Sequence, residues 1–453
     1  MCARNFTPKF SRNFTRSCRV PARSICQPYL IRMSRYLVQK SGPLEGEVHI
    51  SGAKNSALKL MAACLLAEGT HTLRNVPDIA DVTLMSGVLE AIGLSITRKQ
   101  EDHTTTLVIE RGPDVQPEAP YELVEKMRAS TAVLGPLLAT VGEARVAMPG
   151  GDDFGARPID MHLAGLEALG ASFELSHGDI FGTTDGLVGA EIALDYPSVG
   201  ATENLLMAAV LASGSTTIIN AAREPEIADL ASFLNRMGAT VVGAGTSRID
   251  IVGVPELRAV EHTVVPDRLE VGTFLAALGI AGGELTLHNT RPDHLEMLVD
   301  RLGAMGLRIS PEGDSLWAMS RSRPRATDVA TLPYPGLATD FLPLLVAVLC
   351  FADGTSYATE NVFAGRFGYV GEFARMGAGI RVEDHHLVID GVESLSGAPV
   401  RAPDIRAGAA LVVAGLGAEG ITEVRDGYHI DRGYERLEEK LRAIGAPVER
   451  VDD

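Results

Sequence analysis

The densest group of chemically capable side chains in this chain lies on a glycine-rich segment, residues 149–162, with the sequence PGGDDFGARPIDMH. Two adjacent carboxylates, Asp152 and Asp153, precede Arg157 and Pro158. Closely spaced glycines permit positive φ in a loop, and proline is typical of the first turn of a helix. An acid on such a loop, beside an arginine at a helix start, could donate a proton over a bound anion. The alternative is an exposed loop whose aspartates are simply solvated. The segment matches neither GxGxxG nor GxxxxGK[ST].

Charged and polar residues recur where helices are expected to begin. Helix N-termini offer free backbone N–H groups and the positive end of the helix dipole, so they bind anions. The residues at these starts are Lys54, Asn55, Arg128, Ser198, Val199, Gly200, Arg268, Asp340, Arg366, Arg406 and Arg432. Any one arginine could be solvated or structurally paired. The recurring set predicts a substrate that carries phosphate and carboxylate groups.

The net charge limits the classes of partner. The formal charge is −17, with 46% hydrophobic and 22% charged residues, which is typical of a soluble globular protein. An acidic surface repels phosphate backbones and anionic lipids, so we expect no nucleic-acid partner and no membrane insertion. The longest apolar run, residues 341–351, covers about half of a membrane span. An anion must therefore bind in a locally basic cleft.

One short phrase, an apolar residue followed by Gly and then Leu or Ala, ends six expected helices. The copies are Ile92-Gly93-Leu94, Leu169-Gly170-Ala171, Met237-Gly238-Ala239, Met305-Gly306-Leu307, Met376-Gly377-Ala378 and Ile444-Gly445-Ala446. Each indicates a helix closed by a left-handed glycine and followed by a strand. Their separations of 77, 68, 68, 71 and 68 residues predict six repeats of about 70 residues.

Each repeat has the same expected order of elements. A buried Ala- and Leu-rich helix is followed by a strand that begins at Gly, an amphipathic surface helix, a strand and one further strand. Six such repeats predict an α/β fold of two lobes, with inner helices surrounded by sheets that carry outer helices. One lobe is expected to hold residues 36–53 and 266–453 and the other residues 54–265, with a hinge near residues 266–268. Ligands are expected in the cleft between the lobes.

The N-terminal forty residues differ from the rest, with nine Lys or Arg and no acid. Residues 1–35 are interpreted as a basic extension, which could be a targeting peptide, a tail, or sequence before a true start at Met33. Cys64 and Cys350 lie in apolar helical runs and are expected to be buried. No Cys or His cluster has metal-ligand spacing. We expect no metal, no cofactor and a cytoplasmic location.

Six sequence phrases, taken together and in order, resemble the UDP-N-acetylglucosamine enolpyruvyl transferases, or 1-carboxyvinyltransferases, of peptidoglycan synthesis. The phrases are Ser51-Gly52-Ala53-Lys54-Asn55, Met127-Arg128-Ala129-Ser130, Gly155-Ala156-Arg157-Pro158, Ser198-Val199-Gly200-Ala201-Thr202, Ala222-Arg223-Glu224-Pro225-Glu226 and Tyr428-His429-Ile430-Asp431-Arg432-Gly433-Tyr434-Glu435. The resemblance covers about residues 33–453. It implies a two-lobed inside-out α/β barrel of six similar repeats.

The resemblance also implies a reaction in which phosphoenolpyruvate is joined to the sugar 3′-hydroxyl and phosphate is expelled. That chemistry needs one acid and one base. By resemblance, Asp340 is the base near the hydroxyl. Lys54, Arg157 and Arg432, supported by Arg406, would neutralise the phosphate and carboxylate of phosphoenolpyruvate.

The remaining implied contacts are with the nucleotide sugar. Uridine would lie against Arg157, Pro158, Ile159, Asp160 and Met161, the diphosphate against the backbone of Ser198, Val199 and Gly200, and the nucleotide sugar would contact Asn55, Arg128 and Val362. Tyr196 stands where some family members place a cation near the diphosphate, which leaves that contact open.

One departure from the family concerns the acid. Most members carry Cys directly after the Gly-Gly pair of the loop, where this chain has Asp152. A carboxylic acid can still donate a proton, particularly if a closed cleft raises its pKa. It is a poor replacement for a thiolate that attacks an epoxide. We therefore expect an active transferase that is insensitive to the epoxide fosfomycin, with Asp152 as the catalytic acid. Asp153 lies one place off the family register.

Two alternatives stay open. Enolpyruvyl transfer to shikimate 3-phosphate is disfavoured, because the uridine segment and the Ser198 loop would then have no purpose. A non-catalytic homologue that binds a nucleotide sugar and regulates a partner is disfavoured by the presence of Lys54, Asp340 and Arg432 together. The oligomeric state is not indicated by the sequence.

Overall fold

The computed structural model describes residues 34–101, 104–148, 150 and 158–452, and the structural statements below concern these residues. Residues 33–453 form one compact unit, distinct from residues 1–32. Asp152, Asp153 and Arg157 lie outside the described residues. So does the basic extension up to residue 33, whereas its last two predicted residues, Ser34 and Arg35, belong to the first strand.

The fourth repeat illustrates the element order. It consists of α8 (Arg268–Ala281), β14 (Gly283–His288), α9 (Glu296–Met305), β15 (Arg308–Glu312), β16 (Ser315–Ser320) and β17 (Val329–Ala330). The strands β15 and β16 form an antiparallel hairpin beside β14. The short β17 instead pairs in parallel with the next sheet. The sequence predicted fewer strands, because two residues of β17 are too few to produce a periodic pattern.

The other repeats contain an inner helix and an outer helix in the same places. The inner helices are α1 (Lys54–Ala63), α4 (Leu134–Val141), α6 (Val199–Ala209), α10 (Leu342–Leu349) and α12 (Ile405–Gly415), and the outer helices are α2 (Ala80–Ile92), α5 (Asp160–Ala168), α7 (Pro225–Met237), α11 (Val370–Arg375) and α14 (Leu437–Ala443). Short helices complete the set: α3 (Tyr121–Val124), α13 (Tyr428–Asp431), η1 (Cys64–Leu66), η2 (Arg128–Val133), η3 (Pro292–His294) and η4 (Thr339–Phe341).

Each repeat supplies most of one sheet. Within the described residues the sheet orders are β13 (Glu261–Thr263)-β3 (Gly69–Val76)-β5 (Thr104–Arg111)-β4 (Ser95–Glu101), β6 (Glu143–Ala147)-β8 (Asp179–Thr183)-β7 (Ser172–Ser176), β11 (Thr240–Val242)-β12 (Arg248–Val252)-β10 (Ser215–Ile219)-β9 (Glu191–Ala193), β15-β16-β14-β2 (Leu44–His49), β17-β18 (Thr355–Thr359)-β20 (His386–Asp390)-β19 (Gly379–Glu383), and β22 (Pro399–Arg401)-β24 (Ile421–Arg425)-β1 (Ser34–Gln39)-β25 (Val448–Asp452). A further pair is β21 (Leu395–Ser396) with β23 (Ala418–Glu419).

Short parallel strands connect neighbouring sheets. The strands β17 and β22 each pair with the first strand of the following repeat, β18 and β24, whereas β2, which precedes the first repeat, pairs with β14 of the fourth. In the other half of the chain β9 pairs with β10 and β13 with β3, while a bridge joins Glu118 to Arg145. The N-terminal strand β1 lies between β24 and β25, so the first strand of the chain completes the last repeat.

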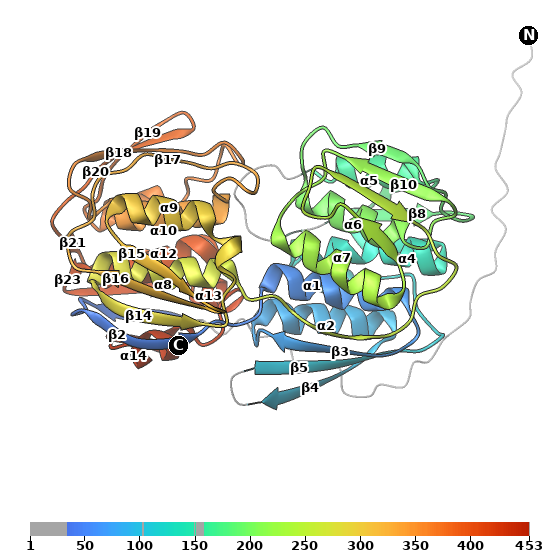
Figure 1. Cartoon of the computed structure of the whole chain (residues 1–453), viewed down its shortest axis with the longest axis horizontal. Helices are drawn as coiled ribbons and strands as arrows, with labels where there is room; N and C mark the ends of the chain where they lie inside the picture. Colours follow the sequence, from blue (N-terminus) through green and yellow to red (C-terminus); the bar gives the residue numbers. More distant parts are fainter. Residues whose placement is uncertain (1–33, 102–103, 149, 151–157, 453) are drawn as a thin grey trace, which may run out of the picture. The chain divides into compact units, whose positions relative to one another are not determined.

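The apolar side chains form two separate cores. One core contains residues 36–50 together with residues 269–448, and the other contains residues 57–264. In the first, α8, α10 and α12 pack against one another. Figure 1 shows α8 and α10 between the sheet that holds β14 and the sheet that holds β18. The predicted lobe boundaries stay a prediction.

The glycines of the six repeated phrases have the conformation that the sequence predicted. Their φ values lie between 88° and 116°, a left-handed region that glycine occupies without a Cβ penalty. Cys64 and Cys350 are buried, as predicted. Among the described residues, no helix is both long and apolar enough to span a bilayer.

Candidate active site

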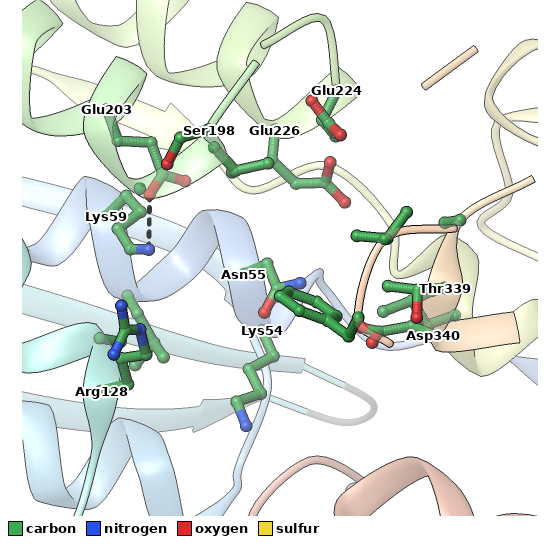
Figure 2. A pocket seen from close by; sticks show the side chains of 18 of the residues that line it. Lys54, Asn55, Lys59, Arg128, Ser198, Glu203, Glu224, Glu226, Thr339 and Asp340 are labelled. Atoms are coloured by element: carbon green, nitrogen blue, oxygen red, sulfur yellow. Dashed lines mark hydrogen bonds and ion pairs between the residues drawn. The ribbon is translucent and has the colours of Figure 1, made fainter. Parts of the chain in front are cut away.

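One cavity of about 520 Å³ gathers helix starts that lie far apart in the sequence. Its walls come from the beginnings of α1, η2, α5, α6, α8 and α12, together with η4 and the end of α13. In Figure 2, Lys54, Asn55 and Lys59 project from one helix, while Thr339 and Asp340 lie across the opening on a different segment. The cavity therefore combines residues that the sequence placed at separate helix starts.

Most of the predicted site residues line this cavity. They are Lys54, Asn55, Arg128, Pro158, Met161, Ser198, Val199, Gly200, Asp340, Val362, Arg406 and Arg432. Ile159 and Asp160 stand at the start of α5 but are not part of the lining. Asp152 and Arg157 lie outside the described residues.

A buried carboxylate joins two of the predicted cations. Asp81, in the first turn of α2, lies 2.7 Å from Lys54 Nζ through Oδ2 and accepts a bond of 3.0 Å from Arg432 Nε through Oδ1. All three side chains are nearly inaccessible to solvent. Burial lowers the pKa of Lys54, and the attraction of Asp81 opposes that effect. Asp81 was not predicted as a site residue from the sequence, although a carboxylate between Ala80 and Val82 on an apolar helix was a usable signal.

Asp340 is surrounded by arginines. Arg366 Nη1 donates a bond of 2.7 Å to Asp340 Oδ1, and Arg406 Nε lies 3.7 Å from Oδ2. Burial alone would raise the pKa of Asp340, but Arg366, Arg406 and Arg268 outweigh it and lower the pKa to about 2. Asp340 is therefore ionised near neutral pH and can accept a hydrogen bond from a hydroxyl group.

The loop with Val362 is tied to the same region by Glu360. The Glu360 Oε1 atom accepts bonds from the backbone N–H groups of Val362 and Phe363, at 2.7 and 3.0 Å, and Oε2 accepts one of 2.7 Å from Thr339 Oγ1. Glu360 is 1% exposed. One buried carboxylate thus fixes Val362 relative to Asp340, which is the next residue after Thr339.

The opposite part of the cavity holds the start of α6. Ser198 caps this helix by accepting a bond of 3.3 Å from the backbone N–H of Ala201. A Cβ on Gly200 would come within 3.0 Å of the His162 ring, so glycine permits this close approach. Burial, and then the charges of Arg128 and Lys59, lower the pKa of His162 to about 4. A neutral imidazole and a helix N-terminus therefore lie side by side here.

Two further ion pairs line the cavity, and neither pairing was predicted from the sequence. Lys59 Nζ lies 2.6 Å from Glu203 Oε2, a pair that is marked in Figure 2. Arg268 forms a two-bond contact with Glu226, with distances of 3.0 and 3.2 Å. Burial raises the pKa of Glu203. The cavity therefore contains both positive and negative side chains. The sequence alone had predicted a basic cleft.

No metal site was predicted from the sequence. Among residues 34–101, 104–148, 150 and 158–452, no group of three or more His, Cys, Asp or Glu side chains is placed to hold a metal ion.

The fold and the sequence both match known enolpyruvyl transferases. Residues 38–441 match the family described as EPSP synthase (3-phosphoshikimate 1-carboxyvinyltransferase). UDP-N-acetylglucosamine 1-carboxyvinyltransferase 2 of Carboxydothermus hydrogenoformans is 50% identical over 424 residues, which cover 93% of this chain and 100% of that protein. The UDP-N-acetylglucosamine 1-carboxyvinyltransferase of Nocardia farcinica is 49% identical over 419 residues, 92% of this chain and 98% of that protein.

Solved structures agree with the predicted fold class. The enolpyruvyl transferase NikO from Streptomyces tendae has a TM-score of 0.84 at 26% identity and covers 93% of this chain and 100% of its own. An EPSP synthase from Acinetobacter baumannii has a TM-score of 0.71 at 19% identity, with coverage of 93% and 100%, and shows the fold alone. These likenesses confirm the α/β fold predicted from the six repeats.

Proposed function

This chain belongs to the EPSP synthase family, and within it to the UDP-N-acetylglucosamine 1-carboxyvinyltransferases. We propose that the cavity described above catalyses the reaction of these transferases. The enzyme transfers the enolpyruvyl group of phosphoenolpyruvate to the 3′-hydroxyl of UDP-N-acetylglucosamine and releases phosphate, the first committed step of peptidoglycan synthesis. The observation that carries this proposal is the meeting of Lys54, Arg406, Arg432 and Asp340 in one cavity with the start of α6. A cytoplasmic location is part of the proposal.

The reaction balances with two protons delivered, one to the methylene carbon and one to the departing phosphate, and two protons removed. The methylene carbon of phosphoenolpyruvate takes up a proton, so that the neighbouring carbon becomes electrophilic and the sugar oxygen attacks it while losing its own proton. The bond to the phosphate oxygen then breaks, and a proton leaves the methyl group to restore the double bond. Lys54, Arg406 and Arg432 would stabilise the phosphate and carboxylate charges throughout.

Asp340 is proposed to act on the sugar hydroxyl. A carboxylate with a pKa of about 2 is a weak base toward a free hydroxyl. It is a good acceptor for orienting that hydroxyl, and it takes the proton as the new carbon–oxygen bond forms and the acidity of the hydroxyl rises. The arginine contacts of Asp340 therefore favour orientation first and proton transfer late in the step.

The nucleotide part of the substrate would occupy the opposite part of the cavity. We assign the diphosphate to the backbone N–H groups at the start of α6, which line the cavity. Pro158, Met161, Arg128 and Asn55 would surround the nucleotide sugar, since they line the same cavity. Contacts from Arg157, Ile159 and Asp160, and the role of Asp152 as proton donor, are proposed from the sequence alone.

The test is a phosphate-release assay with phosphoenolpyruvate and UDP-N-acetylglucosamine. Unmodified enzyme should turn over, and Asp340→Ala should lose on the order of 10²–10⁴-fold in kcat, the range for one acid–base group. Asp353→Ala is the matched control, because its side chain is 82% exposed, and it should retain full activity.

Two outcomes would contradict the proposal. Turnover with shikimate 3-phosphate in place of the nucleotide sugar would favour the first alternative. Tight binding of UDP-N-acetylglucosamine in a calorimeter, with no phosphate release under any condition, would favour a non-catalytic regulator.

A further inference from the structure

A second carboxylate lies behind the group formed by Lys54, Asp81 and Arg432. Glu435 Oε2 accepts a bond of 3.0 Å from Ser51 Oγ and one of 3.2 Å from the backbone N–H of Asp78. Glu435 is 3% exposed and is not part of the cavity lining. It therefore contacts the protein around the cation group and not the space that the substrates would occupy.

The spacing of these contacts is the same on all three segments. Ser51 precedes Lys54 by three residues, Asp78 precedes Asp81 by three, and Glu435 follows Arg432 by three. The three segments are otherwise distant in the chain, since 351 positions separate Asp81 from Arg432. One buried carboxylate thus joins the three stretches of backbone that carry the three charged side chains.

The Ser51 hydroxyl that contacts Glu435 is itself oriented by a further ion pair, between Lys440 and Glu270. Lys440 Nζ donates to Ser51 Oγ at 2.8 Å and to Glu270 Oε1 at 2.6 Å, while the Ser51 backbone N–H donates to Glu270 Oε2 at 2.7 Å. Because Lys440 donates to the Ser51 oxygen, the single Ser51 hydroxyl proton is directed at Glu435. Burial raises the pKa of Glu270, whereas Lys440 lowers it.

This arrangement has a physical consequence for the cavity. The loop with Asp78 leads into α2, so Glu435 holds the start of the helix that presents Asp81. Ser51 lies on the segment between β2 and α1, just before Lys54. Its carbonyl also accepts a hydrogen bond of 2.9 Å from the backbone N–H of Asp267. Displacement of either segment would change the distance between Lys54 and Arg432. A shift of about 1 Å in a positioning group can cost about 10²-fold in rate.

We propose that Glu435 is a positioning residue for the phosphoenolpyruvate end of the cavity, acting through Ser51 and Asp78 on the Lys54–Asp81–Arg432 group. This inference rests on the proposed function. It assigns to Glu435 no contact with substrate. Its carboxylate sets the separation of the two cations, while the uridine and diphosphate contacts proposed for α5 and α6 lie on helices that Glu435 does not contact.

The test compares Glu435→Gln with unmodified enzyme by steady-state kinetics. The carboxylate accepts on both oxygens, from Ser51 and Asp78 at Oε2 and from Arg436 Nη2 at Oε1. An amide has only one acceptor oxygen, so an N–H group must face one of these two sets of donors, and every remaining bond loses its charged acceptor. We expect kcat/KM for phosphoenolpyruvate to fall about 10- to 100-fold. The calorimetric Kd for UDP-N-acetylglucosamine should change less than about twofold, because its proposed contacts lie mainly on η2, α5 and α6 and only Asn55 lies on α1.

The matched control is Asp431→Asn. Asp431 is the neighbour of Arg432 in the chain, but its carboxylate accepts from Tyr36 Oη at 2.9 Å and Arg450 Nη2 at 2.7 Å instead. Its loss should lower the melting temperature and leave kcat/KM for phosphoenolpyruvate unchanged within about twofold.

A double-mutant cycle supplies an independent check. If Glu435 acts partly through the Ser51 hydroxyl, the losses in kcat/KM of Ser51→Ala and Glu435→Gln combine less than additively. Equal losses of affinity for both substrates, or an Asp431→Asn effect as large as that of Glu435→Gln, would overturn the inference. Inactivity of the unmodified enzyme would instead reject the proposed function.

Discussion

At the residue scale, several cations of the cavity are held inside by pairing with a carboxylate. Lys54 has Asp81, Lys59 has Glu203, and Arg268 has Glu226. Burying an unpaired charge costs several kcal/mol, so pairing is what allows an acidic protein to hold these groups inside. A phosphate or carboxylate that enters must compete with the resident partner. Anion binding at Lys54 therefore involves exchange of partners as well as attraction.

The residue at position 152 decides the expected response to fosfomycin. An epoxide inactivates by forming a carbon–sulfur bond with a thiolate while its own carbon–oxygen bond breaks, and Asp152 offers no thiolate. The unmodified enzyme should retain its phosphate-release activity after incubation with fosfomycin, whereas Asp152→Cys should lose activity with time. Asp153→Cys is the control and should stay insensitive. Rapid inactivation of the unmodified enzyme would show that the argument is wrong.

His162 gives a prediction for the pH dependence of stability. Its pKa is about 4 in the folded protein, against about 6.5 in an unfolded chain. Between these values the unfolded state binds a proton that the folded state does not, so stability is lost as pH falls from about 6.5 to 4, by up to about 3 kcal/mol.

The measurement is the free energy of unfolding in urea between pH 7 and 4 for His162→Gln. This variant should show a shallower acid limb than the unmodified protein. His177→Asn, at an exposed position, should leave the slope unchanged. Identical slopes in all three proteins would contradict the assignment to His162.

Part of the site was predictable from single residues and part was not. Lys54, Arg406, Arg432 and Asp340 were identified because cations and acids at helix starts form a pattern along the chain. The pairing of Asp81 with Arg432 was not predictable, because 351 positions separate the two residues and no local pattern links them. Glu360 and Glu435 were missed for the same reason, since both act through contacts with distant segments.

At the element scale, the side chains that line the cavity lie mainly at helix starts, whereas the repeated glycines that indicate the fold lie at helix ends. Asp267 caps α8 and Asp404 caps α12, each by accepting bonds from two backbone N–H groups. Both caps lie beside cavity arginines, Arg268 and Arg406, which follow them within two residues. The opposite, glycine-closed ends occur on the outer helices and turn the chain into the next strand. The repeated glycine phrase was therefore a reliable guide to the fold and said little about the chemistry.

Two glycines of α9 provide a matched test of that division. Gly306 has a φ of 115° at the helix end, so Gly306→Ala should destabilise by about 1 kcal/mol. Gly303 lies in the helix, and a Cβ added there would meet no other atom within 4 Å, so Gly303→Ala should stabilise by about 0.5–1 kcal/mol. Urea unfolding midpoints should move in opposite directions. A gain in stability from Gly306→Ala would contradict the role of the left-handed cap.

At the scale of the whole chain, the repeats depend on strands exchanged between them. The strands β2, β17 and β22 each complete a sheet whose other strands come from a different repeat, so none of these three sheets is formed by one repeat alone. The periodic phrases predicted the number of repeats, because they recur at a nearly fixed spacing. They did not predict the exchange, because the two residues of β17 and the three of β22 are too few for a periodic signal, and no local pattern links the six-residue β2 to the distant β14.

The strand β1 is the strongest case of this dependence and gives the last prediction. It lies between β24 and β25, with Tyr36 opposite both Val424 and Arg450. Tyr36 and Val38 are 1% and 0% exposed. A chain that starts at Met33 keeps β1 and should match the full chain in melting temperature and phosphate release. A chain that starts at Ser41 lacks β1, which leaves two strand edges unpaired and apolar side chains exposed, so it should be insoluble or unfolded. Because the two truncations differ by only eight residues, equal stability of both would contradict the role of β1, and failure of the longer one would show that the fold needs the residues before Met33.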